Sequence, residues 1–240
     1  MASRTVLFTA TTLVLLLGVT KFCAVSDSNA RELTLEKHYE YNPNTIIKTL
    51  EEGDENIFIP VDNETTWYEG DVLETPVNIS QDDYLLIAEA VFKLSQNQSL
   101  ETWKINSMSF SLMCNEVDYG PQSASFSFIY EDMNILGVSA TEVLIYIYPR
   151  SHQIDVFKYV YTRSFQKWDS VDMNLINLSV EKVLLFAENH GAFEKRIGVK
   201  NDCEISIILL SKENRPTWVI NYFPGVYSLS LDALTGTNVK

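Results

Sequence analysis

Alternation of apolar and polar side chains is the pattern that most restricts what this chain can fold into. It runs through three stretches, at 105–114, 124–130 and 154–162, and an aromatic and β-branched run at 143–148 also indicates a strand. Successive side chains of a β-strand point to opposite faces of a sheet, so this period of two predicts strands with one buried face. The apolar side of the first two stretches is formed by Met108, Phe110, Leu112, Cys114, Ala124, Phe126, Phe128 and Tyr130. Turn residues separate the stretches, which predicts antiparallel neighbours.

A helix is predicted directly before these strands. Ser80 is a suitable N-cap, and Asp82 and Asp83 favour the positive end of the helix dipole. Apolar residues then recur at helical spacing on one face, at Tyr84, Ile87, Ala88, Val91 and Leu94. The pattern fades by Asn97. A helix cannot bury such a stripe alone, so we expect it to lie across one face of the strands, in an α+β arrangement.

The same order of elements recurs towards the C-terminus. The pattern predicts a helix over Val180–His190 with Gly191 as its C-cap, and a short bridging strand over Ile197–Val199. Strands are predicted at 203–210, 218–222 and 227–231. We therefore expect an α+β fold in which a helix packs on an antiparallel β-meander, with two such units in tandem. No close residue identity relates the two units, so the repeat is architectural.

Four segments follow from these patterns. Residues 1–26 are predicted to be a signal peptide or signal anchor, and residues 27–79 a polar N-terminal arm or linker. The first α+β unit is expected over 80–165 and the second over 166–240. Within the arm, the sequence indicates one short helix at 45–50 and one short strand at 57–59.

The N-terminal segment has the parts of an export signal. Arg4 supplies the positive start, and Val6–Val19 is an uncharged apolar run that is short for a membrane span of about 20 residues. Small residues around Ala24 and Ala30 provide cleavage sites, and Lys21 interrupts any longer span. The sequence allows a cleaved signal or an uncleaved anchor. In either case we expect a secreted or extracytoplasmic protein, tethered to a membrane only if the segment stays.

Acidic residues outnumber basic ones, with 32 Asp and Glu against 18 Lys and Arg and a formal net charge of −14. Such a field repels phosphate backbones and argues against nucleic acid as a partner. Glu51, Glu52, Asp54 and Glu55 are clustered, but they lack the spacing of a calcium loop. We expect no metal and no cofactor, and a protein or peptide as the partner.

Beyond the export segment the chain has two cysteines, Cys114 and Cys203. In an oxidising compartment they can form one bridge, and their apolar surroundings equally allow two buried thiols. The histidines His38, His152 and His190 are scattered and form no metal-binding motif. A nucleophilic Cys–His pair can be drawn from these residues, but a core or bridged cysteine is the simpler interpretation.

Four Asn-x-Ser/Thr sequons follow the export segment, and each is a candidate glycan acceptor if the protein enters a eukaryotic secretory pathway. Their asparagines are Asn63, Asn78, Asn97 and Asn177. Together with the export segment they predict a glycoprotein. The motif is short, and in a bacterium it carries little meaning.

The closing stretch resembles a PepSY-type domain, in which a helix precedes a meander and the last strand runs into an Asp-Ala-x-Thr-Gly turn. The matching residues here are Asp232, Ala233, Thr235 and Gly236, after strands at 218–220 and 229–231. The resemblance covers residues 181–240, and a Pro-Gly pair at 224–225 departs from the family pattern. It implies an extracytoplasmic, non-catalytic module associated with peptidases or the cell envelope. Physically, Asp should cap local amides and Gly should accept a positive φ.

Local catalytic motifs are absent from the sequence, including the G-x-S-x-G, H-E-x-x-H, Walker and G-x-G-x-x-G patterns. We therefore expect no catalysis, and an exported PepSY-like module that binds a protein or peptide through a sheet face or edge. A lipocalin-like carrier of a small apolar ligand is one alternative, and an extracellular hydrolase with carboxylates distant in sequence is another. The aromatic strand residues Tyr146, Tyr148, Phe157, Tyr159 and Tyr161 are candidates for a binding face or for core positions.

Overall fold

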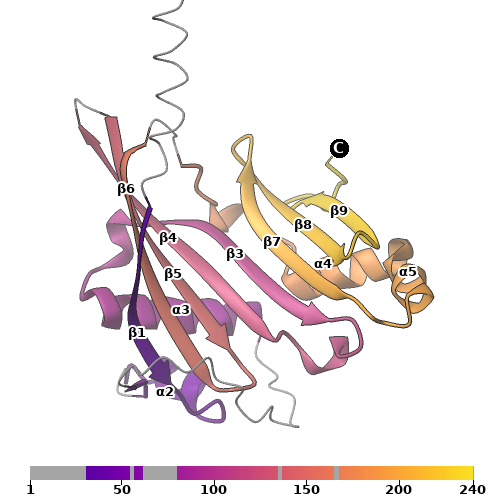
Figure 1. Ribbon diagram of the computed structural model, residues 1–240, viewed down its shortest axis with the longest axis horizontal. Helices are drawn as coiled ribbons and strands as arrows, with labels where there is room; N and C mark the ends of the chain where they lie inside the picture. The colour runs from indigo at the N-terminus through magenta and orange to yellow at the C-terminus, as the bar shows by residue number, and fades with distance from the viewer. Residues whose placement is uncertain (1–30, 55–56, 62–79, 135–136, 165–167, 240) are drawn as a thin grey trace, which may run out of the picture.

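One antiparallel sheet of nine strands runs through the protein. The computed structural model describes residues 31–54, 57–61, 80–134, 137–164 and 168–239. The order of strands across the sheet is β2-β1-β6-β5-β4-β3-β7-β8-β9 (Figure 1). The strands are β1 (Arg31–Glu40), β2 (Ile59–Pro60), β3 (Lys104–Met113), β4 (Ser123–Asn134), β5 (Gly137–Tyr148), β6 (Gln153–Ser164), β7 (Glu204–Lys212), β8 (Arg215–Phe223) and β9 (Tyr227–Asp232). The α+β class expected from the sequence is confirmed.

The two groups of strands expected from the sequence are joined edge to edge. β3, which begins the first group, pairs antiparallel with β7, which begins the second, from Ser107–Leu210 to Met113–Glu204. Consecutive strands pair within each group, β3 to β6 and β7 to β9. Sheet hydrogen bonding is therefore continuous from β2 to β9.

The segment expected as a polar arm contributes to this sheet. Within it, Arg31–Glu40 forms β1, which pairs antiparallel with β6 along its whole length, with a bulge between Leu35 and Lys37. The bulge shifts the register by one residue and interrupts the regular alternation. This strand was not predicted, because the sequence shows no clear period there. Helix α2 (Ile46–Glu51) confirms the short helix expected at 45–50, and the two-residue β2 begins at the last residue of the strand expected at 57–59.

Helix α3 (Gln81–Gln96) confirms the predicted helix and its cap. The Ser80 hydroxyl accepts from the Asp83 amide at 3.3 Å, and the Asp83 carboxylate accepts from the Ser80 amide at 3.1 Å. Each side chain satisfies a backbone donor that the first helical turn leaves open. The helix ends at Asn97, which adopts the left-handed conformation with φ 51°.

The second predicted helix is longer and bent. α4 (Val180–Ala187) continues through the π-helical turn η4 (Glu188–Ala192) into α5 (Phe193–Gly198). Gly191 was expected to end the helix, but its φ of 103° produces a kink after which the helix resumes. The strand expected over 197–199 is wrong, because α5 and the turn after it occupy those residues.

The core lies between the sheet and the helices. In Figure 1, α3 and α4 both lie behind the sheet, and α3 contacts β4 and β5 while α4 contacts β8. The strands in contact with these helices turn alternate apolar residues towards them, such as Phe126 on β4, Ile145 on β5 and Trp218 on β8, all fully buried. The opposite face of the sheet, which we call the helix-free face, carries none of these helices.

Candidate functional site

The helix-free face is the candidate site because it gathers side chains that the core does not use. On β5, the buried Val143, Ile145 and Ile147 alternate with the partly exposed Leu144, Tyr146 and Tyr148. On β6, Ile154 and Val156 are buried, and Asp155 and Phe157 between them are partly exposed. Because the period is two, every second residue of these strands lies on the helix-free face.

An aromatic patch forms where the end of β5 lies beside the first half of β6. We define it as Tyr146, Tyr148 and Phe157. The rings of Tyr146 and Tyr148 are 6.2 Å apart and nearly parallel at 12°, and Phe157 meets Tyr146 edge-on at 5.7 Å. Burial raises the pKa of Tyr148 to about 12, with a further contribution from the Asp155 carboxylate, so its hydroxyl stays protonated at neutral pH. Partly exposed tyrosines offer apolar contact area together with hydrogen-bonding groups.

Serines take the place of aromatic residues on the neighbouring strands. Ser109 on β3 lies opposite Ser125 on β4, and their hydroxyls are 2.7 Å apart. The Ser111 hydroxyl donates to the Glu204 carboxylate at 2.7 Å, which connects β3 to β7. Beyond them, Ile208 on β7 lies opposite Ser109 and is partly exposed. Hydroxyl and apolar groups therefore continue the face across the middle of the sheet.

A histidine–carboxylate pair lies beside the aromatic patch. His38 on β1 is opposite Asp155 on β6, and its Nδ1 makes a short hydrogen bond with the Asp155 carboxylate. Their side chains are 16% and 23% exposed. A carboxylate that accepts from Nδ1 orients the ring, which is the relation that a catalytic base requires. Asp155 also contributes to the pKa of Tyr148.

A buried carboxylate on the same face is bonded through both of its oxygens. Glu142 is 9% exposed. Its Oε1 accepts from the Ser127 hydroxyl and its Oε2 from the Tyr161 hydroxyl, both at 2.6 Å. The Tyr161 ring packs on Trp168 at 4.7 Å. The two carboxylate oxygens therefore tie β5 to both of its neighbours, β4 and β6.

One edge of the sheet is covered by the C-terminal residues. The Asp232 amide donates to the Thr237 carbonyl and the Val239 amide donates to the Ser230 carbonyl, both at 2.9 Å. A bridge between Leu231 and Asn238 lies between these bonds. Part of the outer edge of β9 is thus already paired, and at the other edge β2 has only two residues.

The Asp232–Gly236 turn behaves as the sequence predicted. Asp232 Oδ1 accepts from the Leu234 and Thr235 amides at 3.0 and 2.8 Å, and Gly236 has φ 72°. The bond from the Thr235 amide is the main reason why the pKa of Asp232 lies below its ordinary value. Ala233 is fully buried, and its carbonyl accepts from the Asn177 and Leu178 amides. The turn therefore anchors the segment that enters α4.

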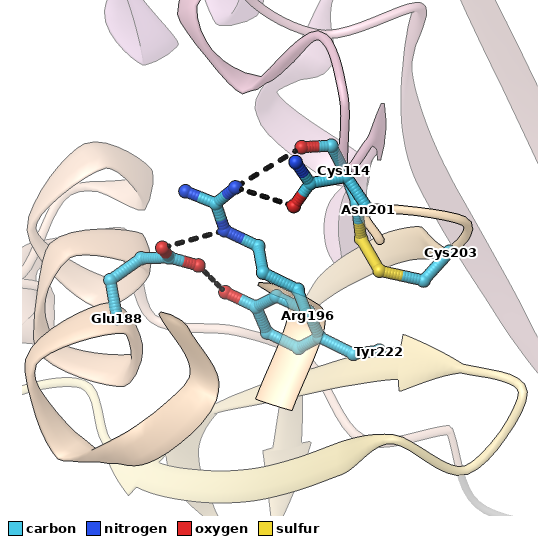
Figure 2. Close-up of polar contacts among 6 residues, drawn as sticks. All are labelled: Cys114, Glu188, Arg196, Asn201, Cys203 and Tyr222. Carbon is cyan, nitrogen blue, oxygen red and sulfur yellow. Dashed lines mark hydrogen bonds and ion pairs between the residues drawn. A yellow bond between two sulfur atoms is a disulfide. The ribbon is translucent and has the colours of Figure 1, made fainter. Parts of the chain in front are cut away.

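A polar network, shown in Figure 2, holds the bent helix against the sheet. Arg196 on α5 donates from Nε to Glu188 at 2.8 Å and from Nη1 to Asn201 at 2.9 Å. The Tyr222 hydroxyl donates to the other Glu188 oxygen at 2.6 Å, and burial together with this bond raises the pKa of Tyr222. Arg196 Nη1 also reaches the Cys114 carbonyl at 3.4 Å. With its members engaged in these bonds, the network is structural.

The two cysteines meet in the structure, and the three histidines have separate partners. A disulfide joins Cys114 and Cys203, whose Cα atoms are 5.3 Å apart, so neither of these two cysteines has a free thiol for a Cys–His pair. His152 lies in the β5–β6 turn against Tyr41, and burial lowers its pKa. His190 stacks on Phe186 at 3.8 Å. The part of the chain that the structure describes contains no cluster of His, Cys, Asp or Glu suited to a metal ion.

Two of the four sequons fall on described residues. Asn97 is exposed at the end of α3. Asn177 is exposed too, and its side-chain amide donates to the Leu234 carbonyl at 3.3 Å. Asn63, Asn78 and the export segment lie outside the described residues.

Sequence reasoning missed the His38–Asp155 pair and the Glu188–Arg196–Tyr222 network. His38 and Asp155 are 117 positions apart, and Tyr222 is 34 positions from Glu188. The i, i+8 spacing of Glu188 and Arg196 spans the kink at Gly191, so a regular helical period does not reveal it. The pairing of β1 with β6 brings His38 to Asp155, and the bent helix brings Glu188 and Arg196 together beside Tyr222 on β8.

Comparisons of the chain with protein-family models, with curated proteins and with solved structures found no match. Among the described residues, no helix has the length and apolar character that crossing a membrane requires.

Proposed function

We propose that this chain is an exported, non-catalytic binding module of PepSY-like type, which contacts a protein or peptide outside the cytoplasm through its helix-free face. The observation that carries the proposal is the aromatic patch of Tyr146, Tyr148 and Phe157, partly exposed on a sheet face that the helices leave uncovered. Tyrosine is enriched at protein interfaces because its ring supplies apolar contact and its hydroxyl a hydrogen bond.

The PepSY-like part of the proposal rests on element order and on one turn. A helix precedes consecutive antiparallel strands twice, as α3 before β3 to β6 and as α4–α5 before β7 to β9. This order is compatible with two tandem units that share one sheet. The hydrogen bonds of Asp232 and the positive φ of Gly236 give the closing motif a structural role.

Two independent features, an apolar N-terminal run and a disulfide, support export. The apolar run at 6–19 has the length of a signal sequence. The Cys114–Cys203 disulfide is a bond that persists in oxidising compartments and is rare in reducing ones. The protein is then secreted, or tethered outside the cytoplasm by residues 1–26.

The helix-free face suits a partner better than the sheet edges do. Adding a strand to an edge needs a row of open backbone groups. Residues 237–239 already pair with part of β9, and β2 is two residues long. The face is continuous across β5, β4, β3 and β7 and carries aromatic, hydroxyl and aliphatic groups.

The alternatives receive less support. A lipocalin-like carrier encloses its ligand by closing its sheet, whereas this sheet is open, with β2 and β9 at its two ends. For hydrolysis, the carboxylates of Glu142 and Glu188 are each bonded through both oxygens to neighbouring side chains. The His38–Asp155 pair is the arrangement nearest to catalytic chemistry, and among the described contacts no serine, threonine or cysteine nucleophile adjoins it.

The test is site-specific photo-cross-linking in the native medium or envelope. A benzophenone amino acid replaces Tyr148 on the aromatic patch, and the matched control replaces Leu185, which is 61% exposed on α4. We expect an adduct with one protein or peptide from position 148 and none from position 185. Equal adducts from both positions would contradict a role for the helix-free face. A small apolar molecule retained by the purified protein, without any adduct, would favour the carrier instead.

A further inference from the structure

The asparagines of the sequon at the end of α3 and of the sequon before α4 differ in their hydrogen bonds, and this difference bears on which of them can carry a glycan. Asn97-Gln98-Ser99 links α3 to the short 3-10 helix η1 (Leu100–Thr102), and all three residues of the sequon are exposed. Asparagine is one of the few residues that adopts the left-handed conformation easily, which is the conformation of Asn97. The helix therefore ends at this asparagine and turns the chain outward.

The other two residues of this sequon, Gln98 and Ser99, hold the turn in place through hydrogen bonds from neighbouring residues. The Trp103 indole donates to Gln98 Oε1 at 3.2 Å, and the Ser99 hydroxyl accepts from the Glu101 amide at 3.2 Å. The Asn97 backbone amide donates to the Lys93 carbonyl at 2.9 Å. No hydrogen bond from the Asn97 side chain to another described residue is present, so its amide can carry a substituent without loss of a contact in the fold.

Asn177 provides the contrast within the same molecule. Its side chain donates to the Leu234 carbonyl, and its backbone amide donates to the Ala233 carbonyl at 3.0 Å. The next residue, Leu178, packs against the core, and its carbonyl accepts from the Trp218 indole at 2.9 Å. A glycan on Asn177 would have to displace the bond to Leu234 in the seam between the closing turn and α4.

We propose that Asn97 carries an N-linked oligosaccharide in the exported protein. The donor class is an oligosaccharide linked to a polyisoprenyl diphosphate. The Asn97 Nδ2 forms a bond to the anomeric carbon, the bond from that carbon to the diphosphate oxygen breaks, and the amide loses one proton as the lipid diphosphate leaves. No oxidation or reduction takes place. The inference rests on the exported location in the proposed function.

The position of this glycan is compatible with binding at the helix-free face. Asn97 ends α3, and α3 lies behind the sheet in Figure 1, on the side opposite the aromatic patch. A bulky, hydrated substituent there covers the helix side of the molecule and leaves Tyr146, Tyr148 and Phe157 open.

The experiment expresses the full chain in eukaryotic secretory cells, beside a second form in which a well-characterised signal peptide replaces residues 1–26. Enzymatic deglycosylation in heavy-oxygen water, followed by peptide mass spectrometry, marks each occupied asparagine. Asn97→Asp removes the acceptor but tolerates the left-handed backbone. Ser99→Ala removes the sequon, and Ser99→Thr retains both the sequon and the hydroxyl that caps η1.

We expect Asn97 to be occupied in most molecules of the secreted protein and of Ser99→Thr, with loss of one glycan mass in Asn97→Asp and Ser99→Ala. Occupancy of Asn177 should be lower than that of Asn97. Secreted protein with an unmodified Asn97, or with Asn177 occupied in preference to it, would overturn the inference. If only the form with the replaced signal is secreted, export by residues 1–26 fails, while the occupancy of Asn97 in that form still decides the glycan.

Discussion

The first helix–strand region, from α3 to β6, and the second, from α4 to β9, differ in the lengths of their elements and in the bonds that accompany their buried cores. α3 is a continuous helix of 16 residues with a capping box, and three of its four strands have 12 residues. α4 has 8 residues before the kink, and β7, β8 and β9 have 9, 9 and 6. The second region is shorter, it contains a polar network and the Asp232 turn, and a disulfide ties it to the first region. Both regions have a buried apolar core, with Phe126 and Ile145 in the first and Trp218 and Ile220 in the second, so the difference indicates that the shorter second region adds covalent and polar ties to its apolar burial.

The largest effect should come from the bond that joins the two regions. Replacing both Cys114 and Cys203 with serine opens a loop spanning 89 positions at the ends of β3 and β7. On the chain-entropy model, we expect the free energy of unfolding to fall by about 4.6 kcal/mol. Denaturant unfolding of the variant, and of the native protein with and without reductant, measures this loss. An unchanged midpoint after reduction would show that the second region does not depend on the bridge.

The polar network provides the next test. Arg196→Met leaves Glu188 without its cation, and both side chains are about 15% exposed in the native protein. We expect a loss of about 2–3 kcal/mol, below the range for fully buried pairs, because water retains some access. Hydrogen exchange should rise in α5 and stay unchanged in α3. Tyr222→Phe, which removes one hydrogen bond to Glu188, is the matched variant and should cost about 1 kcal/mol.

The two helix starts allow a direct comparison of equivalent serines. Ser80 caps α3 with a side-chain hydrogen bond, whereas Ser179, at the N-cap of α4, makes no such bond. Ser80→Ala should therefore lower the free energy of unfolding by about 1 kcal/mol, and Ser179→Ala by only a few tenths. Thermal or denaturant unfolding of both variants in one buffer decides this. Equal losses would mean that the caps do not distinguish the two regions.

The smallest effect concerns the closing turn and depends on pH. The pKa of Asp232 is lowered by the bond from Thr235, so the ionised form is favoured in the folded state. Its contribution is complete above the ordinary Asp pKa of about 4 and is lost as the pH falls through the lower folded value. Asp232→Ala should be slightly less stable than the native protein at pH 7, and the gap should narrow in acid. A gap that widens in acid would contradict this sign.

Local pattern was informative wherever the chain is locally regular. The N-cap at Ser80, the strand patterns of β3 to β6 and the Asp232 turn each depend on residues a few positions apart, and the structure contains them as expected. β1 was not predicted, because its bulge interrupts the period of two. The continuation of the helix beyond Gly191 was not predicted either, because a glycine near a helix end ordinarily stops the helix.

The candidate site was predictable only in part. The sequence identified Tyr146, Tyr148 and Phe157 as face or core residues without deciding between them, because alternation shows that two faces differ but not which one the helices cover. It gave no sign of the partnership between His38 and Asp155, which depends on β1 pairing with β6.

By itself, then, the sequence determined the class of the fold, the start of α3 and the conformation of the closing turn, since these follow from propensities and hydrogen bonds within short segments. Only the tertiary structure decided that the two strand groups share one sheet through β3 and β7, that Cys114 meets Cys203, and that the aromatic patch faces away from the helices. The physical reason is that strand pairing across long separations is selected by the packing of the whole core, and no short stretch of sequence encodes it.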